Sequence, residues 1–256
     1  MSCMDRGPTR QAISRLARDV RALRGDALAE HGIYYRHSST NILEGQALIT
    51  GGEATPYEMG FYVFDFKFPV DYPHRPPVAT FRTVDARHRT RFNPNCYRNG
   101  KVCLSVLNTW QGDQWTGCQT ISSVLLAIKA NVLAVAHPLL NEPGVGKNHS
   151  DFENYHAIVA FKNLEVAAWD AAVDVSKKAG VVWPELRPIV AKTFLSNYGP
   201  FVDIITSRAS QIGAKAVATD IYNMSAHINY EGLRREVTEK GPAVNKALES
   251  IAEIDV

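Results

Sequence analysis

Cysteine is scarce in this 256-residue sequence, and no two cysteines form a CxxC pair. The four are Cys3, Cys96, Cys103 and Cys118. Disulfide-stapled folds contain more cysteine, and structural zinc sites usually take paired ligands from such motifs. We therefore expect no disulfide framework and no metal site. A reducing compartment, cytoplasmic or nuclear, is the expected location.

Long apolar runs and a strong charge of one sign are also missing. The most apolar region, Val124–Leu140, is interrupted by Lys129, Asn131 and His137, so we expect no membrane-spanning helix. The first residues are charged and lead into an amphipathic pattern, which is not typical of a signal peptide. A net charge of +2 is too small to indicate a nucleic-acid partner. We expect contact with neither membranes nor nucleic acids.

Residues 33–81 have the pattern of β-strands. In Gly60–Phe68, aromatic side chains alternate with Asp65 and Lys67, which is typical of a strand with one buried face. Three further runs have strand character: Ile33–Tyr35, Gly45–Thr50 and Val78–Arg82. Because short Gly- or Pro-rich turns separate these runs, we predict a four-stranded antiparallel meander.

One face of this sheet needs cover, which two predicted helices can provide. The first begins after the N-cap Thr9, and the second spans Ser122–Ala136. Apolar residues of the first helix share one face: Ile13, Leu16, Ala17, Val20 and Leu23. Its arginines mostly lie on the other faces, where a solvated surface is their ordinary role. The predicted fold class is α+β, with the sheet flanked by an N-terminal helix and C-terminal helices.

The chain after His149 has helical patterns and contains neither internal repeats nor a low-complexity linker. Four helices are predicted in its last part: Glu185–Asn197, Phe201–Ile212, Glu231–Lys240 and Ala243–Ile254. Gly199-Pro200 is expected to separate the first two of these helices, and Gly241-Pro242 the last two. We predict a core domain at residues 1–175 and a helical extension at 176–256 that packs on it. The extension is either a packing appendage or an element of partner specificity, and the sequence leaves both open.

Two tight turns precede Cys103. Asn93-Pro94-Asn95 forms the first, because proline fixes φ and asparagine bonds to the local backbone. Asn99-Gly100 forms the second, because glycine accepts a positive φ. A cysteine thiolate can act as a nucleophile and the Asn95 amide can stabilise an oxyanion, so the pattern is compatible with acyl transfer. The alternative is that Cys103 is a small buried apolar residue and Asn95 only a turn former.

These turns resemble the active-site motif of the ubiquitin-conjugating enzymes. The resemblance comprises Asn93-Pro94-Asn95, the step of eight residues from Asn95 to Cys103, and the run Gly100–Leu104. Upstream, Phe68–Pro77 resembles the Phe-Pro-x-x-Tyr-Pro-x-x-Pro-Pro segment of that family. The resemblance therefore implies the fold of that family, which agrees with the predicted α+β arrangement.

Further motifs extend the resemblance along the chain. Trp115-Thr116 resembles the segment after the active site, and Ile121–Ile128 resembles the helix that follows. Tyr97–Ser105 and Asn141–Gly144 are most similar to the Z-type branch, whose members have a helical C-terminal extension. Some Z-type enzymes accept a second, ubiquitin-like modifier from a non-standard activating enzyme.

The resemblance implies a carrier of ubiquitin or a ubiquitin-like modifier. Cys103 would accept the modifier as a thioester from an activating enzyme in an ATP-dependent cascade, and pass it to a substrate lysine or a ligase cysteine. Asn95 would steady the oxyanion or its own loop. Glu142 stands where the family often has an aspartate that helps to position the incoming lysine. No cofactor is implied.

The resemblance also implies surfaces for partner proteins. The first helix contributes to docking of the activating enzyme in the family, and the residues concerned here are Arg10, Arg15 and Arg18. Pro73 and His74 lie in one ligase-binding loop and Trp115 in another. Three positions depart from the family pattern: His74 replaces an apolar residue, Gly117 a proline and Ser105 an aspartate. A ligase that binds these loops would therefore meet a different surface.

Two alternatives to the carrier remain. A non-catalytic scaffold of the same fold would lack the cysteine, so the presence of Cys103 with Asn95 argues against it. A cysteine hydrolase would need a histidine base bonded to Cys103, and the candidates are His137, His149 and His156. No hydrolase motif surrounds Cys103.

Overall fold

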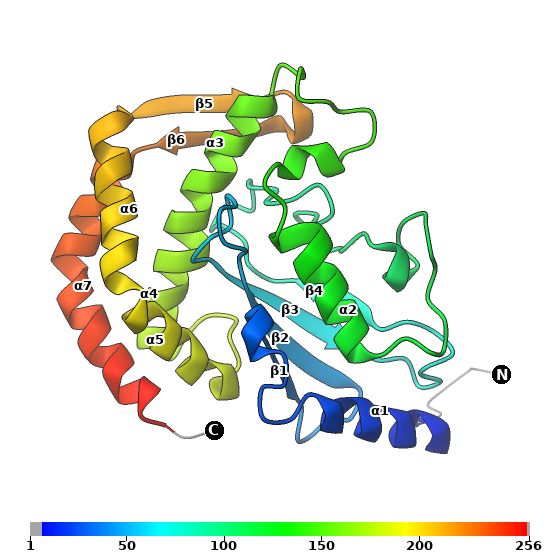
Figure 1. Cartoon of the computed structure of the whole chain (residues 1–256). Coiled ribbons are helices and arrows are strands. Elements are labelled where there is room, and N and C mark those ends of the chain that lie inside the picture. The colour runs from blue at the N-terminus through cyan, green and yellow to red at the C-terminus, as the bar shows by residue number, and fades with distance from the viewer. Residues whose placement is uncertain (1–6, 255–256) are drawn as a thin grey trace.

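The computed structural model describes residues 7–254, so that Cys3 lies outside the described residues. Its centre is an antiparallel sheet in the order β1-β2-β3-β4, as the sequence predicts (Figure 1). The strands are β1 (Ile33–His37), β2 (Glu44–Thr50), β3 (Phe61–Lys67) and β4 (Val78–Phe81). In the register, Phe64 of β3 lies between Ala47 and Phe81. These residues therefore share one face, which is buried in the main core.

Helices α1 (Arg10–Ala22) and α2 (Ile121–Ile128) contribute to the same core. The predicted N-cap is confirmed, because Thr9 Oγ1 accepts a hydrogen bond from the backbone N–H of Ala12 at 3.0 Å. A reciprocal pair of contacts between Thr120 and Ser123 starts α2. This helix continues as a π-helical turn, Lys129–Leu133, and ends before the predicted Ala136.

The buried face of α1 differs from the predicted one. Its inward residues include Leu16 and Asp19, whereas Ile13 is 41% exposed and Ala17 is exposed. Hydrophobic periodicity did not indicate Asp19, because a carboxylate enters a core only when hydrogen-bond donors meet it. Asp19 meets three such donors, described below, and the two that lie outside α1, on Tyr72 and Ile121, favour this rotation of the helix against the core.

The C-terminal half is mostly helical. Helix α3 (Phe152–Lys162) continues through a π-helical stretch, Asn163–Asp170, into α4 (Ala171–Ser176). The later helices are α5 (Arg187–Ser196), α6 (Tyr198–Gln211) and α7 (Tyr230–Ala252). Short 3-10 turns occur at Ala29–His31, Ser105–Leu107, Pro138–Asn141, Pro184–Leu186 and Ile221–Asn223. None of the helices within residues 7–254 has the length and apolarity needed to cross a membrane.

The C-terminal half covers the second face of the sheet. Gln46 of β2, only 1% exposed, donates through Nε2 to the Val181 carbonyl at 2.9 Å and accepts from the Trp183 N–H at 2.7 Å. Leu48 and Val63 lie on the same face as Gln46 and are buried. Because both faces are covered, β2 is almost continuously buried rather than alternating.

The extension is mostly helical, as predicted, but residues 215–228 form strands that the sequence did not predict. There the chain forms a hairpin of β5 (Lys215–Thr219) and β6 (Met224–Ile228), which contacts α3. Figure 1 shows this hairpin along the top of the helical layer. Its strands bury Val217, Met224 and Ile228 but are otherwise short and rich in alanine and polar residues. Such strands carry little local signal, and their packing against α3 stabilises them.

The predicted break at Gly241-Pro242 is also wrong, because α7 is one helix with Pro242 inside it. Buried residues run along it at helical spacing: Tyr230, Leu233, Val237, Gly241, Val244, Leu248 and Ile251. An interior proline costs about 3 kcal/mol, while each buried aliphatic side chain contributes about 1.5–3 kcal/mol. The three aliphatic residues beyond the proline therefore outweigh its cost. The predicted separation of the two preceding helices is confirmed, but the break is at Asn197, and Gly199-Pro200 lies in the first turn of α6.

Candidate functional site

The first predicted turn before Cys103 is confirmed. The N–H of Cys96 donates to the Asn93 carbonyl at 2.9 Å, and the N–H of Asn95 donates to Asn93 Oδ1 at 2.8 Å. Asn93 is completely buried, and its Nδ2 donates to the Tyr57 hydroxyl at 2.9 Å and the Val132 carbonyl at 3.1 Å. The turn is thereby fixed to the core, which gives the site a rigid base.

The second turn returns the chain toward Asn95. Tyr97 and Lys101 are joined by a backbone hydrogen bond of 2.9 Å, and Gly100 has the expected positive φ, 88°. A Cβ atom on Gly100 would approach Thr80 Cγ2 to 2.8 Å, so both the backbone and the space require glycine. This turn brings Cys103 beside Asn95 although they are eight residues apart.

Asn95 and Cys103 hold each other by two hydrogen bonds. The Cys103 N–H donates to the Asn95 carbonyl at 2.8 Å, and Asn95 Nδ2 donates to the Cys103 carbonyl at 2.6 Å. Asn141 supports this pair, since its Nδ2 lies 2.9 Å from Asn95 Oδ1 and 2.8 Å from the Asn131 carbonyl. Of the two roles predicted for Asn95, this geometry corresponds to stabilising the loop that carries Cys103.

The cysteines near this loop differ in their surroundings. Cys103 is 2% exposed and Cys118 is exposed, and both are free, as is Cys96. Cys96 belongs to the hydrophobic core, where burial raises the pKa of its thiol. A thiol held protonated in this way is a poor nucleophile. Cys103, held by Asn95, is therefore the candidate nucleophile of the site.

Glu142 contacts the C-terminal extension. The hydroxyl of Tyr222 donates a hydrogen bond to Glu142 Oε2. Tyr222 lies in the turn between β5 and β6 with φ 60° and ψ 5°, a left-handed conformation that is rare for a bulky side chain. Burial, and then the hydrogen bond to Glu142, raise the pKa of Tyr222, so its hydroxyl remains a donor. The sequence did not predict Tyr222 as a site residue, because the residues it meets lie about 80 and more positions away.

Two arginines join Tyr222 to the Cys103 loop. The guanidinium of Arg91 lies between the rings of Tyr97 and Tyr222, 3.9 and 4.0 Å from their centroids. Arg98 Nη2 donates to the carbonyl of Tyr222 at 2.6 Å and to that of Asn223 at 3.2 Å. Such cation–π contacts are favourable, particularly away from solvent. The hairpin turn therefore lies against the same loop that carries Asn95.

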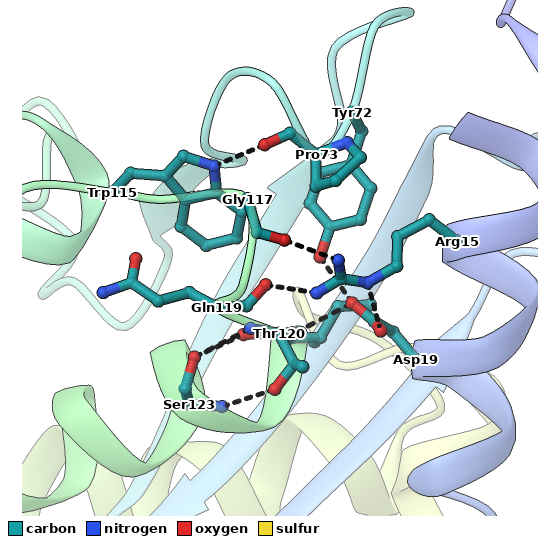
Figure 2. A network of polar contacts seen from close by, with 10 residues as sticks. Arg15, Asp19, Tyr72, Pro73, Trp115, Gly117, Gln119, Thr120 and Ser123 are labelled. Carbon is teal, nitrogen blue, oxygen red and sulfur yellow. Dashed lines mark hydrogen bonds and ion pairs between the residues drawn. The ribbon is translucent and has the colours of Figure 1, made fainter. Parts of the chain in front are cut away.

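The arginines of α1 that were predicted to bind the activating enzyme are not equally exposed to solvent. Figure 2 shows Arg15 pointing inward, where its Nε donates to Asp19 Oδ1 at 2.8 Å and its Nη1 to the Gly117 carbonyl at 2.7 Å. Its Nη2 donates to the Gln119 carbonyl. Because these contacts occupy its guanidinium, Arg15 is a structural residue, contrary to its predicted place on an exposed docking face. Arg10 and Arg18 are exposed.

The two predicted ligase loops are joined in the structure. Trp115 is 8% exposed, and its Nε1 donates to the Pro73 carbonyl at 2.7 Å (Figure 2). Pro73 is buried as well, whereas His74 is exposed, with its Nε2 3.0 Å from Gln11 Oε1 of α1. Through these contacts both loops and α1 lie together, and of the three predicted ligase-loop residues only His74 is exposed.

The histidines proposed as hydrolase bases do not contact Cys103. Within residues 7–254, no hydrogen bond joins the Cys103 thiol to an imidazole. His137 instead lies against Phe152 and His156, with ring centroids 5.3 and 6.1 Å away. His149 Nδ1 accepts from the Asp151 N–H at 3.1 Å. In the part of the chain that the structure describes, no group of three His, Cys, Asp or Glu side chains is placed to hold a metal ion.

Comparison with known proteins finds one protein family. The sequence model of the family described as "Ubiquitin-conjugating enzyme" matches residues 15–159. "Ubiquitin-conjugating enzyme E2 Z" from Homo sapiens is 33% identical to this chain, over 87% of this chain and 61% of that protein. The protein of the same name from Danio rerio is also 33% identical, over 91% of this chain and 71% of that protein. The human "Dual E2 ubiquitin-conjugating enzyme/E3 ubiquitin-protein ligase BIRC6" is 48% identical over 39% of this chain and 2% of that protein. The chain thus spans about three fifths of the length of its human E2 Z relative.

Proposed function

This chain belongs to the ubiquitin-conjugating enzyme family, and on that basis we propose that it carries ubiquitin or a ubiquitin-like modifier as a thioester on Cys103. The observation that carries the proposal is the pair of hydrogen bonds between Asn95 and Cys103. They fix the backbone that carries the thiol, so the position of Cys103 beside Asn95 is set before the modifier arrives. Because Cys103 is only 2% exposed, the approach suits an extended main-chain tail such as the C-terminus of a modifier.

Charging is a thioester exchange. The Cys103 thiolate attacks the carbonyl of the modifier bound to the activating enzyme, a new C–S bond forms, and the cysteine thiolate of the activating enzyme leaves. Transfer is the second exchange, in which a lysine amine or a ligase thiolate attacks the Cys103 thioester. Its C–S bond breaks and Cys103 leaves as the thiolate.

Transfer to lysine needs help that charging does not. A lysine with an ordinary pKa is neutral only about once in 2,500 molecules at pH 7. A carboxylate that orients the amine and accepts its proton would relieve this limit. We assign that role to Glu142, because it directly follows Asn141, whose amide contacts Asn95.

The partners follow from the family and from the exposed residues. The activating enzyme of an ATP-dependent cascade would dock on α1, with Arg10 and Arg18 accessible, and similarity to E2 Z proteins makes the non-standard activating enzyme a candidate. A ligase would bind the surface around His74. The three free cysteines of the described chain support a reducing compartment, cytoplasmic or nuclear.

A charging assay tests the proposal. The protein is incubated with ATP, ubiquitin and each available activating enzyme, and is analysed on a non-reducing gel. We expect a thiol-sensitive shift of one modifier that disappears in Cys103→Ala and becomes thiol-resistant in Cys103→Ser. Cys96→Ser and Cys118→Ser are matched controls that should still be charged. If no activating enzyme charges the folded wild type, or if Cys96→Ser abolishes charging, the assignment to Cys103 is wrong.

A further inference from the structure

The turn of the β5–β6 hairpin touches both sides of the candidate site. Its residues lie roughly 120 positions after Cys103 in the chain. The Tyr222 hydroxyl meets Glu142, and the Tyr222 ring and carbonyl meet Arg91 and Arg98. A hairpin that only filled space on α3 would not need polar contacts with these two separate loops.

Three further contacts hold this hairpin turn in place. The N–H of Ile221 donates to Asp151 Oδ2 at 2.8 Å, and Asp151 is buried. The N–H of Arg91 points to Met224 Sδ at 3.2 Å. The Tyr222 ring packs edge-on against Tyr155, 6.0 Å between centroids. These contacts leave the Tyr222 side chain little freedom.

Tyr222 also has a strained backbone conformation. A non-glycine residue in the left-handed region is strained and persists only where its surroundings enforce it. The strained residue is the one whose hydroxyl reaches Glu142. Strain at a residue that contacts a reactive group often accompanies a functional role.

We infer that Tyr222 is a positioning residue for the transfer of the modifier from Cys103 to lysine. Its hydroxyl holds Glu142 Oε2, which leaves Oε1 to accept a hydrogen bond from the incoming amine. The amine then attacks the thioester carbonyl, the C–N bond forms, the C–S bond breaks, and the amine proton passes to the carboxylate and on to water. Charging of Cys103 uses no amine, so it does not depend on this contact. The inference rests on the proposed function.

The variant Tyr222→Phe isolates the hydroxyl, because phenylalanine retains the ring between Arg91 and Tyr155. The protein is charged, the activating enzyme is stopped, and loss of the thioester to free lysine is followed. We expect charging to be unchanged and discharge to lysine to be about three- to tenfold slower, the effect of one lost hydrogen bond. Tyr198→Phe, which removes a hydroxyl elsewhere in the extension, should discharge like the wild type.

Two further measurements separate positioning from structure. In a Glu142→Ala background, Tyr222→Phe should have no additional effect, because the group that it positions is missing. Discharge to hydroxylamine, an amine that is already neutral at neutral pH, should be slowed less than discharge to lysine.

The outcomes distinguish this inference from the proposed function. If wild-type protein forms no thioester, the proposed function fails. If thioester forms but Tyr222→Phe discharges at the wild-type rate or faster, the inference fails. It also fails if Tyr222→Phe slows discharge equally in the Glu142→Ala background, or slows hydroxylamine and lysine alike. Thermal unfolding of each variant verifies that the protein is folded.

Discussion

Replacing Asp19 with alanine tests the polar network of Figure 2. Asp19 is 3% exposed and accepts hydrogen bonds from Arg15 Nε at 2.8 Å, the Tyr72 hydroxyl at 2.5 Å and the Ile121 N–H at 3.4 Å. One carboxylate therefore joins α1, the loop before β4 and the start of α2. We expect its removal to weaken all three attachments together.

The size of the effect follows from what remains buried. Breaking a buried ion pair by removing one partner costs about 3–5 kcal/mol. The side chain of Arg15 retains 15% exposure and two carbonyl partners, which places the effect near the lower limit. The hydroxyl of Tyr72, a fully buried residue, loses its acceptor, and such a loss costs about 1–3 kcal/mol. Because both losses come from one event, we expect a total of about 3–4 kcal/mol.

Urea unfolding measures this loss. With an m-value of about 3 kcal/mol/M, the midpoint of Asp19→Ala should fall by about 1 M relative to the wild type. Asp71→Ala is a matched control, because Asp71 pairs with Arg75 at the same four-residue spacing and 2.9 Å, but at the surface. Exposed pairs contribute little to stability. If Asp19→Ala shifted the midpoint no more than Asp71→Ala, the reasoning about burial would be refuted.

Three other substitutions give distinct outcomes. Pro242→Ala should raise the free energy of unfolding by about 1–2 kcal/mol in urea, since the restored helical N–H outweighs the more flexible unfolded chain; a lower value would contradict this. Burial and nearby His137 lower the pKa of His156, so stability present above about pH 6.5 should be lost as pH falls through that lowered pKa. His156→Gln should flatten this part of the pH–stability curve, and an unchanged curve would exclude His156 as its source. Asn141→Ala should slow lysine discharge about three- to tenfold through loss of its contact with Asn95, and should slow it less than Asn95→Ala.

The sheet and the Cys103 loop could be predicted because their signals are local. Alternating aromatics in Gly60–Phe68 indicated β3, and the Asn-Pro-Asn and Asn-Gly turns indicated how Asn95 and Cys103 meet. Local signals failed where the partner is remote. The hairpin β5–β6 depends on α3, and the buried face of α1 depends on donors from Tyr72 and α2.

The sequence by itself determined the meander and the family, and it predicted Cys103 as the nucleophile, because turn chemistry, strand periodicity and motif spacing act over a few residues. Only the tertiary structure decided that Arg15 points inward, that α7 continues through Pro242, and that Tyr222 meets Glu142. Each of these depends on burial against segments distant in the chain, where the free energy of packing and of paired polar groups exceeds local preference.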